Sequence, residues 1–210
     1  LVRNGRYKED FRNFFEDMPD GYLSEVEAVA MDMNASYNIL FKEKLPHVII
    51  IYDRYHMQAQ FGKDVLGAVR LREAREHQNE AKKLLEMATA QEDPEKKQQL
   101  KAEAGAEKQQ YSQLKKLRWT LLTNGDSLSD KKAQYLNVIL SSHSDLAVCY
   151  AMKEELCALF KLADFSDAFL GWKHWFDAAE ASGIPELVKF AKLKRLRIDG
   201  IIEHTVFPIS

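Results

Sequence analysis

The chain is poor in cysteine and has no long apolar run. Its 210 residues include two cysteines, Cys149 and Cys157, which are too few for a disulfide framework. Their spacing of eight puts both on one side of a helix, so we expect buried thiols in a reducing cytoplasm. No segment approaches the roughly twenty apolar residues of a membrane span, and the first residues do not resemble a signal peptide. The sequence thus predicts a cytoplasmic protein with no membrane partner.

The chain also lacks an excess of charge of either sign. The formal net charge of −2 neither favours nor excludes a nucleic-acid partner, because local patches of charge matter more than their sum. The chain starts like the exit of a strand, without an initiator methionine, and it closes without a charged tail. We therefore expect a piece of a longer protein.

Two apolar runs each end in an aspartate. Residues 26–31 lead into Asp32, residues 47–52 lead into Asp53, and residues 35–44 between them have the spacing of a helix that Pro46 ends. This order predicts a βαβ unit with parallel strands. Both carboxylates would then lie at the carboxyl edge of the sheet, where open α/β sheets bind ligands, about 5 Å apart if the strands are neighbours.

The two aspartates allow three interpretations. As a pair they could bind Mg²⁺ or Mn²⁺, since hard cations take carboxylate oxygens and such sites drive phosphoryl transfer. Alternatively, Asp32 could cap the helix that starts near Ala35. A phosphatase or a nucleotide-binding protein could also use both, but neither strand is followed by a glycine-rich loop. His56 beside Asp53 is either a ligand or proton donor, or a hydrogen-bonded structural residue.

The rest of the chain has the patterns of helices. We expect these over residues 7–17, 58–90, 94–122, 129–140, 146–160, 165–182 and 185–196. The three tryptophans (Trp119, Trp172 and Trp175) are assigned to the core. The fold class is α/β with a large all-α insertion, mostly α by residue count. Its regions are a βαβ core over residues 1–72, a charged and exposed helical hairpin over 73–122, and a helical block over 123–210.

Several basic residues could follow a phosphate backbone, although charge runs are more often solvated faces and cations are also favoured near helix C-termini. The candidates for DNA binding are Arg54, Lys63, Arg70, Lys115, Lys116, Arg118, Lys192, Lys194 and Arg195, with Arg197 nearby.

Several motifs in this order resemble one known family, over essentially the whole chain. They are residues 29–33 with Tyr37, 45–47, 53–56, 69–70, 117–122 with Asn124, 128–129, 147–156, Trp175 and 182–184. The chain resembles the catalytic region of bacterial insertion-sequence transposases of the ISL3 type. These enzymes have a DDE (Asp-Asp-Glu) active site on an RNase H-like core, so the resemblance implies a partial core of this kind interrupted by the helical block.

The resemblance implies a role for each strand-end residue. Asp32 takes the place of the second catalytic aspartate and metal ligand, at the end of the fourth strand. Asp53 and His56 take supporting places in an Asp-Arg-Phe-His element, in which Tyr55 replaces the phenylalanine. The first aspartate and the final glutamate are expected outside this stretch, and Glu203 is not assigned to the site.

The resemblance also implies an activity for the intact protein. This is DNA cleavage and strand transfer assisted by Mg²⁺ or Mn²⁺, with transposon ends and target DNA as partners, a homo-oligomer, and location at the nucleoid when DNA is bound. This part of the protein is expected to be inactive alone. The alternative is a non-catalytic protein, derived from a transposase, that binds DNA or an intact transposase.

Overall fold

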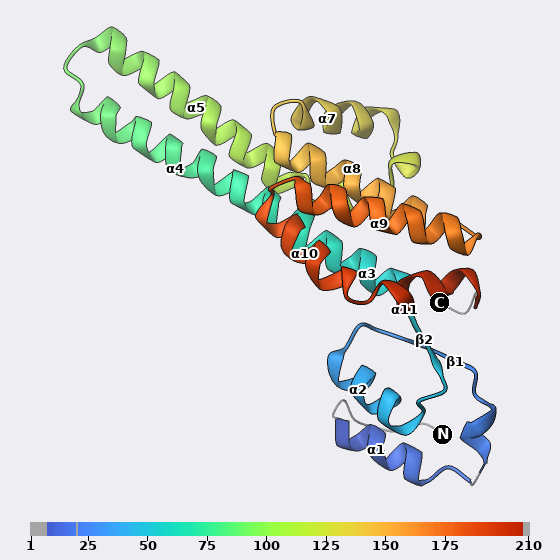
Figure 1. Ribbon diagram of the computed structural model, residues 1–210. Helices are drawn as coiled ribbons and strands as arrows, with labels where there is room; N and C mark the ends of the chain where they lie inside the picture. Colours follow the sequence, from blue (N-terminus) through green and yellow to red (C-terminus); the bar gives the residue numbers. More distant parts are fainter. Residues whose placement is uncertain (1–7, 20, 208–210) are drawn as a thin grey trace.

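The computed structural model describes residues 8–19 and 21–207, with side chains described from residue 12 onward. The chain is mostly helical, and it carries one small parallel sheet near its N-terminal end (Figure 1). This confirms the mostly-α character that the sequence predicts.

The sheet pairs β1 (Ala28–Met31) with β2 (Ile49–Tyr52) in parallel, and α2 (Ala35–Lys44) connects them. Met31 lies opposite Tyr52 at the carboxyl end of the pair. The predicted βαβ unit is therefore confirmed, although both strands start two residues later than expected. Before it come α1 (Lys8–Glu16) and the short helix η1 (Tyr22–Glu25). Within residues 8–19 and 21–207, no third strand joins this sheet.

A nearly continuous helical rod leaves the sheet. It consists of α3 (Arg54–Phe61), a π-helical turn, η2 (Gly62–Gly67), and α4 (Ala68–Ala90). The sequence pattern placed the start of this helix at residue 58, but it begins four residues earlier. The reason is local: the Asp53 carboxylate accepts hydrogen bonds from the backbone N–H groups of Tyr55 and His56 and so caps the first turn.

The helices α4 and α5 (Pro94–Lys116) form a long hairpin that projects from the rest of the molecule (Figure 1). Asp93 caps α5 through the backbone N–H of Glu95, at 2.9 Å, and Pro94 occupies the first helical position. The sequence predicted one helix as far as residue 122. Instead the helix breaks at the buried Leu117, and α6 (Arg118–Leu122) follows as a separate short helix.

The remaining helices form the helical block. They are η3 (Gly125–Ser127), α7 (Asp130–Leu140), α8 (Ser144–Leu159), α9 (Phe165–Ala181), α10 (Pro185–Arg195), α11 (Ile198–Ile202) and η4 (Glu203–Thr205). α3 and η2 run into this block, so Phe61 of α3 lies 5.1 Å from Phe190 and 6.0 Å from Trp175, measured between ring centroids. The core thus joins the rod to the block. No helix among the described residues is long and apolar enough to cross a membrane.

The tryptophans divide between the core and the surface. Trp172 and Trp175 are fully buried, as expected, and the Trp175 indole N–H donates to the Met152 carbonyl. Trp119 is 70% exposed, so its assignment to the core was wrong. The break at Leu117 explains this, because α6 buries Leu121 and leaves Trp119 outside, where the Arg118 guanidinium stacks on its ring.

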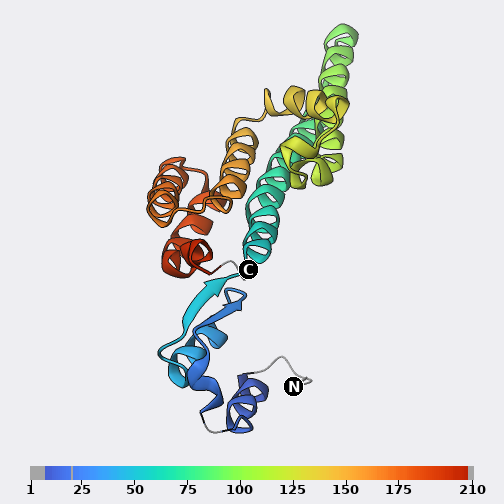
Figure 2. The ribbon, with the colours of Figure 1, turned by 90° about the vertical axis from the view of Figure 1, so that its right-hand side faces the viewer.

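The short helix α11 covers the end of β2. Figure 2 shows the last helices beside the tips of the strand arrows. Gly200 makes this contact possible: a Cβ atom there would lie 2.6 Å from the Tyr52 ring and 2.8 Å from the Ile50 carbonyl oxygen. The block therefore contacts the sheet at the edge where both aspartates lie.

Candidate active site at the ends of the parallel strands

Asp32 follows β1 directly and is half-buried. Its Oδ1 accepts a hydrogen bond from the Asn34 backbone N–H at 2.9 Å. Asn34, not Asp32, caps α2, because its own side-chain oxygen accepts from the Ser36 N–H. Among the described residues, no hydrogen-bond donor reaches the second carboxylate oxygen of Asp32. One oxygen is therefore open to a ligand.

Asp53 follows β2 and has both carboxylate oxygens engaged. Oδ1 caps α3, and Oδ2 lies 2.9 Å from the His56 Nδ1 atom. Burial alone would raise the pKa of Asp53. The hydrogen bonds from the His56 ring and from the backbone N–H groups of Tyr55 and His56 together outweigh it, so that the pKa is lowered. Asp53 is thus an ionised helix cap that also holds the exposed His56 ring.

Two cations from the helical block lie beside Asp32. The Lys194 side chain, at the end of α10, is only 8% exposed, and its ammonium donates to the Gln60 side-chain oxygen and lies 3.2 Å from the Met33 sulfur. The Arg197 guanidinium donates to the Met33 carbonyl. Both therefore bind the residue next to Asp32.

Burial, and then the charge of Arg197, lower the pKa of Lys194 to about 8, and the carboxylates of Asp64 and Asp32 oppose that shift. The sequence pattern did not single out Gln60 or Asp64. No local signal could have done so, because they belong to α3 and η2 and meet the strand end only through packing.

The side chains at this edge of the sheet provide one ligand for a metal ion, the carboxylate of Asp32. Asp32 offers a hard, partly exposed oxygen, which is what Mg²⁺ and Mn²⁺ prefer. Both carboxylate oxygens of Asp53 already have a hydrogen-bond partner, one in the cap of α3 and one at the His56 ring. Within the described parts of the chain, no group of three His, Cys, Asp or Glu side chains is placed to hold a metal ion. Asp32 can therefore serve as one ligand of a larger set.

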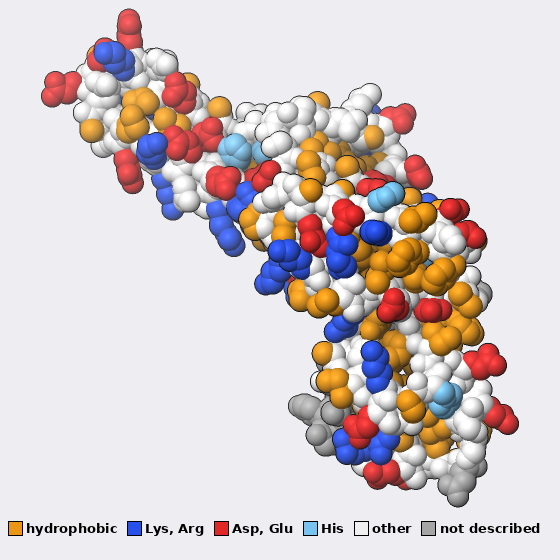
Figure 3. All heavy atoms as spheres, viewed as in Figure 1, with side chains coloured by type: hydrophobic (Ala, Val, Ile, Leu, Met, Phe, Trp, Pro, Cys, Tyr) orange, Lys and Arg blue, Asp and Glu red, His pale blue; other side chains and the backbone are white. Residues whose placement is uncertain are grey.

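The predicted DNA-binding cations lie in different surroundings. Arg54 stacks on the Tyr55 ring, with 4.9 Å from its guanidinium carbon to the centroid. Arg195 pairs with Asp177 and Glu180 at 2.7 Å each. Lys115, Lys116 and Lys192 are exposed. Lys and Arg side chains gather with acidic ones over α10 in Figure 3.

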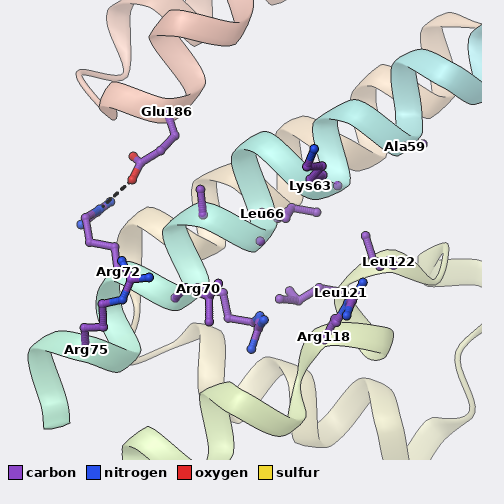
Figure 4. Close-up of a pocket in the computed structure, with 14 residues that line it drawn as sticks. Ala59, Lys63, Leu66, Arg70, Arg72, Arg75, Arg118, Leu121, Leu122 and Glu186 are labelled. Carbon is purple, nitrogen blue, oxygen red and sulfur yellow. Dashed lines mark hydrogen bonds and ion pairs between the residues drawn. The ribbon is translucent and has the colours of Figure 1, made fainter.

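Three of the predicted cations meet in one place. Lys63, Arg70 and Arg118 line a pocket of about 730 Å³ at the base of the hairpin (Figure 4). Two more cations of α4, Arg72 and Arg75, also line it, and the sequence pattern had not selected them. They follow Arg70 on the same helix, but only the placement of α6 opposite α4 brings the group together.

In sequence, the chain is similar to transposases. A family model with the description "Transposase", for DDE transposases of the ISL3 type, matches residues 1–210. The "Transposase for insertion sequence element IS1001" of Bordetella parapertussis is 29% identical over 206 residues, which are 98% of this chain and 44% of that protein. The chain thus spans less than half the length of the curated relative it matches. No solved structure matches it significantly.

Proposed function

Since this chain belongs to the ISL3-type family of DDE transposases, we propose that it supplies part of a catalytic domain that cuts and rejoins DNA. The observation that carries this proposal is the position of Asp32. It follows a strand of a parallel pair, with one carboxylate oxygen that no described residue occupies. The carboxyl edge of such strands is where open α/β sheets place their reactive groups.

The proposed core is RNase H-like, with β1 and β2 as its fourth and fifth strands. Asp32 is its second catalytic carboxylate and a metal ligand. The first aspartate and the final glutamate come from parts of the protein outside residues 1–210. Asp53 supports the site by fixing the start of α3 and the His56 ring, which follow the strand end.

The metal would be Mg²⁺ or Mn²⁺, which would activate the attacking oxygen and stabilise charge on the scissile phosphate. The chain's own residues hold Asp32 in place. The Asn34 N–H orients its carboxylate, and Arg197, through the Met33 carbonyl, ties the strand end to the helical block. Lys194 adds a positive charge near the carboxylate. This charge would favour the approach of a DNA phosphate.

The proposed partner is DNA, both transposon ends and target. Cations without ion pairs among the described residues, such as Lys63, Lys116 and Arg118, would contact phosphates, so binding would weaken steeply with salt. Lys194 and Arg195 would keep their contacts with Gln60 and with Asp177 and Glu180, and so would not bind phosphates directly. We further propose that the intact protein works as a homo-oligomer at the nucleoid.

The test is the substitution Asp32→Asn in the full-length protein. Strand transfer should fall by at least about a thousandfold, because a neutral amide replaces a charged metal ligand, while DNA binding stays close to that of the wild type. Asp130→Asn is the matched control, since Asp130 is exposed on α7, far from the sheet (Figure 1). Assays of strand transfer and of duplex binding measure both effects.

Two results would change the assignment. Full strand transfer by Asp32→Asn would rule out Asp32 as a catalytic ligand. A full-length protein that binds DNA but never nicks it with Mg²⁺ or Mn²⁺ would instead point to the alternative, a non-catalytic DNA- or transposase-binding protein.

A further inference from the structure

The pocket at the base of the hairpin has an unusual balance of charge. Five of its lining side chains are cationic and one is acidic. The acidic one, Glu186, binds Arg72 at 3.0 Å, and Arg72 also pairs with Asp145 at 2.9 Å. Within residues 8–19 and 21–207, the other four cations (Lys63, Arg70, Arg75 and Arg118) have no ion pair. The pocket thus holds uncompensated positive charge.

Arg70 forms the buried floor of this pocket. Its side chain is 6% exposed and runs from α4 toward the segment that carries Arg118 and Leu121 (Figure 4). One guanidinium nitrogen, Nη1, donates to the Leu114 and Lys115 carbonyls at 2.9 and 3.2 Å, so that Arg70 also caps the end of α5. Its Nε atom is buried and has no hydrogen-bond partner among the described residues. One strong donor is therefore left over.

The charged group that lowers the pKa of Arg70 has the same sign as Arg70 itself. Burial, and after it the guanidinium of Arg118, lower the pKa of Arg70. A buried cation with an unpaired donor and a cationic neighbour is costly unless an anion completes it. A guanidinium presents planar, forked donors that match a phosphate group in particular.

We propose that this pocket binds a backbone phosphate of DNA, with Arg70 at its floor and Lys63 and Arg118 at its rim. The proposal rests on the proposed function, because that function supplies DNA as the source of the phosphate. The volume of about 730 Å³ exceeds that of one phosphate group and leaves room for the adjoining sugars. Leu66, Leu121 and Leu122 supply apolar walls for them.

The neighbouring surface supports a path for the DNA strand. Lys115 and Lys116 are exposed at the end of α5, directly before the break that leads to Arg118. The exposed Trp119 ring, under the Arg118 guanidinium, follows on the same short helix. A strand whose phosphate enters the pocket would pass these cations, and it could rest a sugar or base on the ring.

The first test measures the affinity of the chain for a labelled DNA duplex over a range of salt concentrations. The double variant Lys63→Gln/Arg118→Gln should bind about tenfold more weakly or worse, and the slope of log K against log salt should lose about one unit, for the one phosphate that the pocket neutralises. The control Lys101→Gln/Lys108→Gln removes two exposed cations of α5 that do not line the pocket. It should keep the wild-type slope.

The outcomes separate this inference from the proposed function. If both double variants bind alike, the pocket is not a phosphate site, while DNA binding by the chain still stands. If the wild-type chain binds no duplex at all, DNA binding by this part of the protein fails, and the inference fails with it.

The second test reads Arg70 directly. The NMR signal of its Nε–H group, assigned by its absence in Arg70→Lys, should shift when a short oligonucleotide is added, and at higher concentration when inorganic phosphate is added alone. A purely structural Arg70 would respond to neither, which would overturn the site. A signal that responds to inorganic phosphate but not to the oligonucleotide would overturn DNA as the source.

Discussion

At the residue scale, Lys194 is a charged side chain in a buried position, where desolvation destabilises the charged form. It is nearly fully buried, and the Arg197 guanidinium lies close to it. The Gln60 oxygen and the nearby carboxylates of Asp32 and Asp64 offset part of that penalty. Burying this charge costs stability, and it also puts a positive charge next to the proposed catalytic aspartate; such compromises are common at functional sites.

This placement predicts a dependence of stability on pH. Lys194 has a pKa of about 8 in the folded chain and an ordinary value of 10.5. Between these values the unfolded chain binds more protons, so the free energy of unfolding gains a rising contribution as the pH increases from 8 to 10.5. Lys194→Met should remove that contribution. Urea unfolding at several pH values measures the slope.

Lys192→Met is the control for the Lys194 prediction, because Lys192 is exposed on the same helix. It should leave the slope between pH 8 and 10.5 as in the wild type. Equal slopes in the wild type and in Lys194→Met would show that Lys194 keeps an ordinary pKa in the folded state.

At the element scale, short contacts rather than long helices fix the site. The helix α11 has only five residues, yet it covers the end of β2 because Gly200 has no side chain. A short helix has little stability of its own, so packing holds it in place. The same contact keeps Arg197, one residue before α11, at the Met33 carbonyl.

Gly200→Ala should therefore destabilise the chain by about 1–3 kcal/mol, the usual cost of overpacking. The added Cβ would meet a backbone oxygen as well as the Tyr52 ring, and the backbone cannot yield cheaply. Gly105→Ala is the matched control. Gly105 lies in α5 with open space around its Cα, so alanine there should stabilise by up to about 1 kcal/mol. Equal effects of the two substitutions would contradict the packing of α11.

At the scale of the whole molecule, Arg72 connects three long helices. It lies on α4 and pairs with Asp145 on α8 and Glu186 on α10, at the base of the projecting hairpin (Figures 1 and 4). The Arg72 and Glu186 side chains are 33% and 19% exposed. This partial burial should make the Arg72–Glu186 pair stronger than a surface ion pair, and we expect it to help orient the hairpin against the helical block.

A double-mutant cycle with Arg72→Met and Glu186→Gln should therefore give a coupling energy of about 1 kcal/mol in the free energy of unfolding. The coupling should shrink at high salt. A parallel cycle on Glu80 and Lys83, an exposed pair within α4, is the control and should give close to zero. A coupling at Arg72 no larger than at this surface pair would mean that packing alone orients the hairpin.

Local signals in the sequence determined the secondary structure and the place of the strand-end aspartates. Asp93-Pro94 and Pro185 mark helix starts, Pro46 follows the end of α2, and the two apolar runs became parallel strands. These features depend on residues a few positions apart, so the pattern alone suffices. Two helix boundaries were predicted wrongly, because apolar periodicity reveals neither the cap at Asp53, which starts α3 earlier, nor the break at Leu117, which ends α5 earlier.

The tertiary structure alone decided what surrounds those aspartates. Lys194 reaches Met33 across 161 positions of sequence, and Arg70 reaches the Leu114 carbonyl across 44. In the sequence both are ordinary members of basic runs. Packing buried them, gave Lys194 a place beside Asp32 and left Arg70 with an unpaired donor at the lining of a cationic pocket. Such partners come from helices that meet only in the folded chain, and no local pattern of residues encodes that meeting.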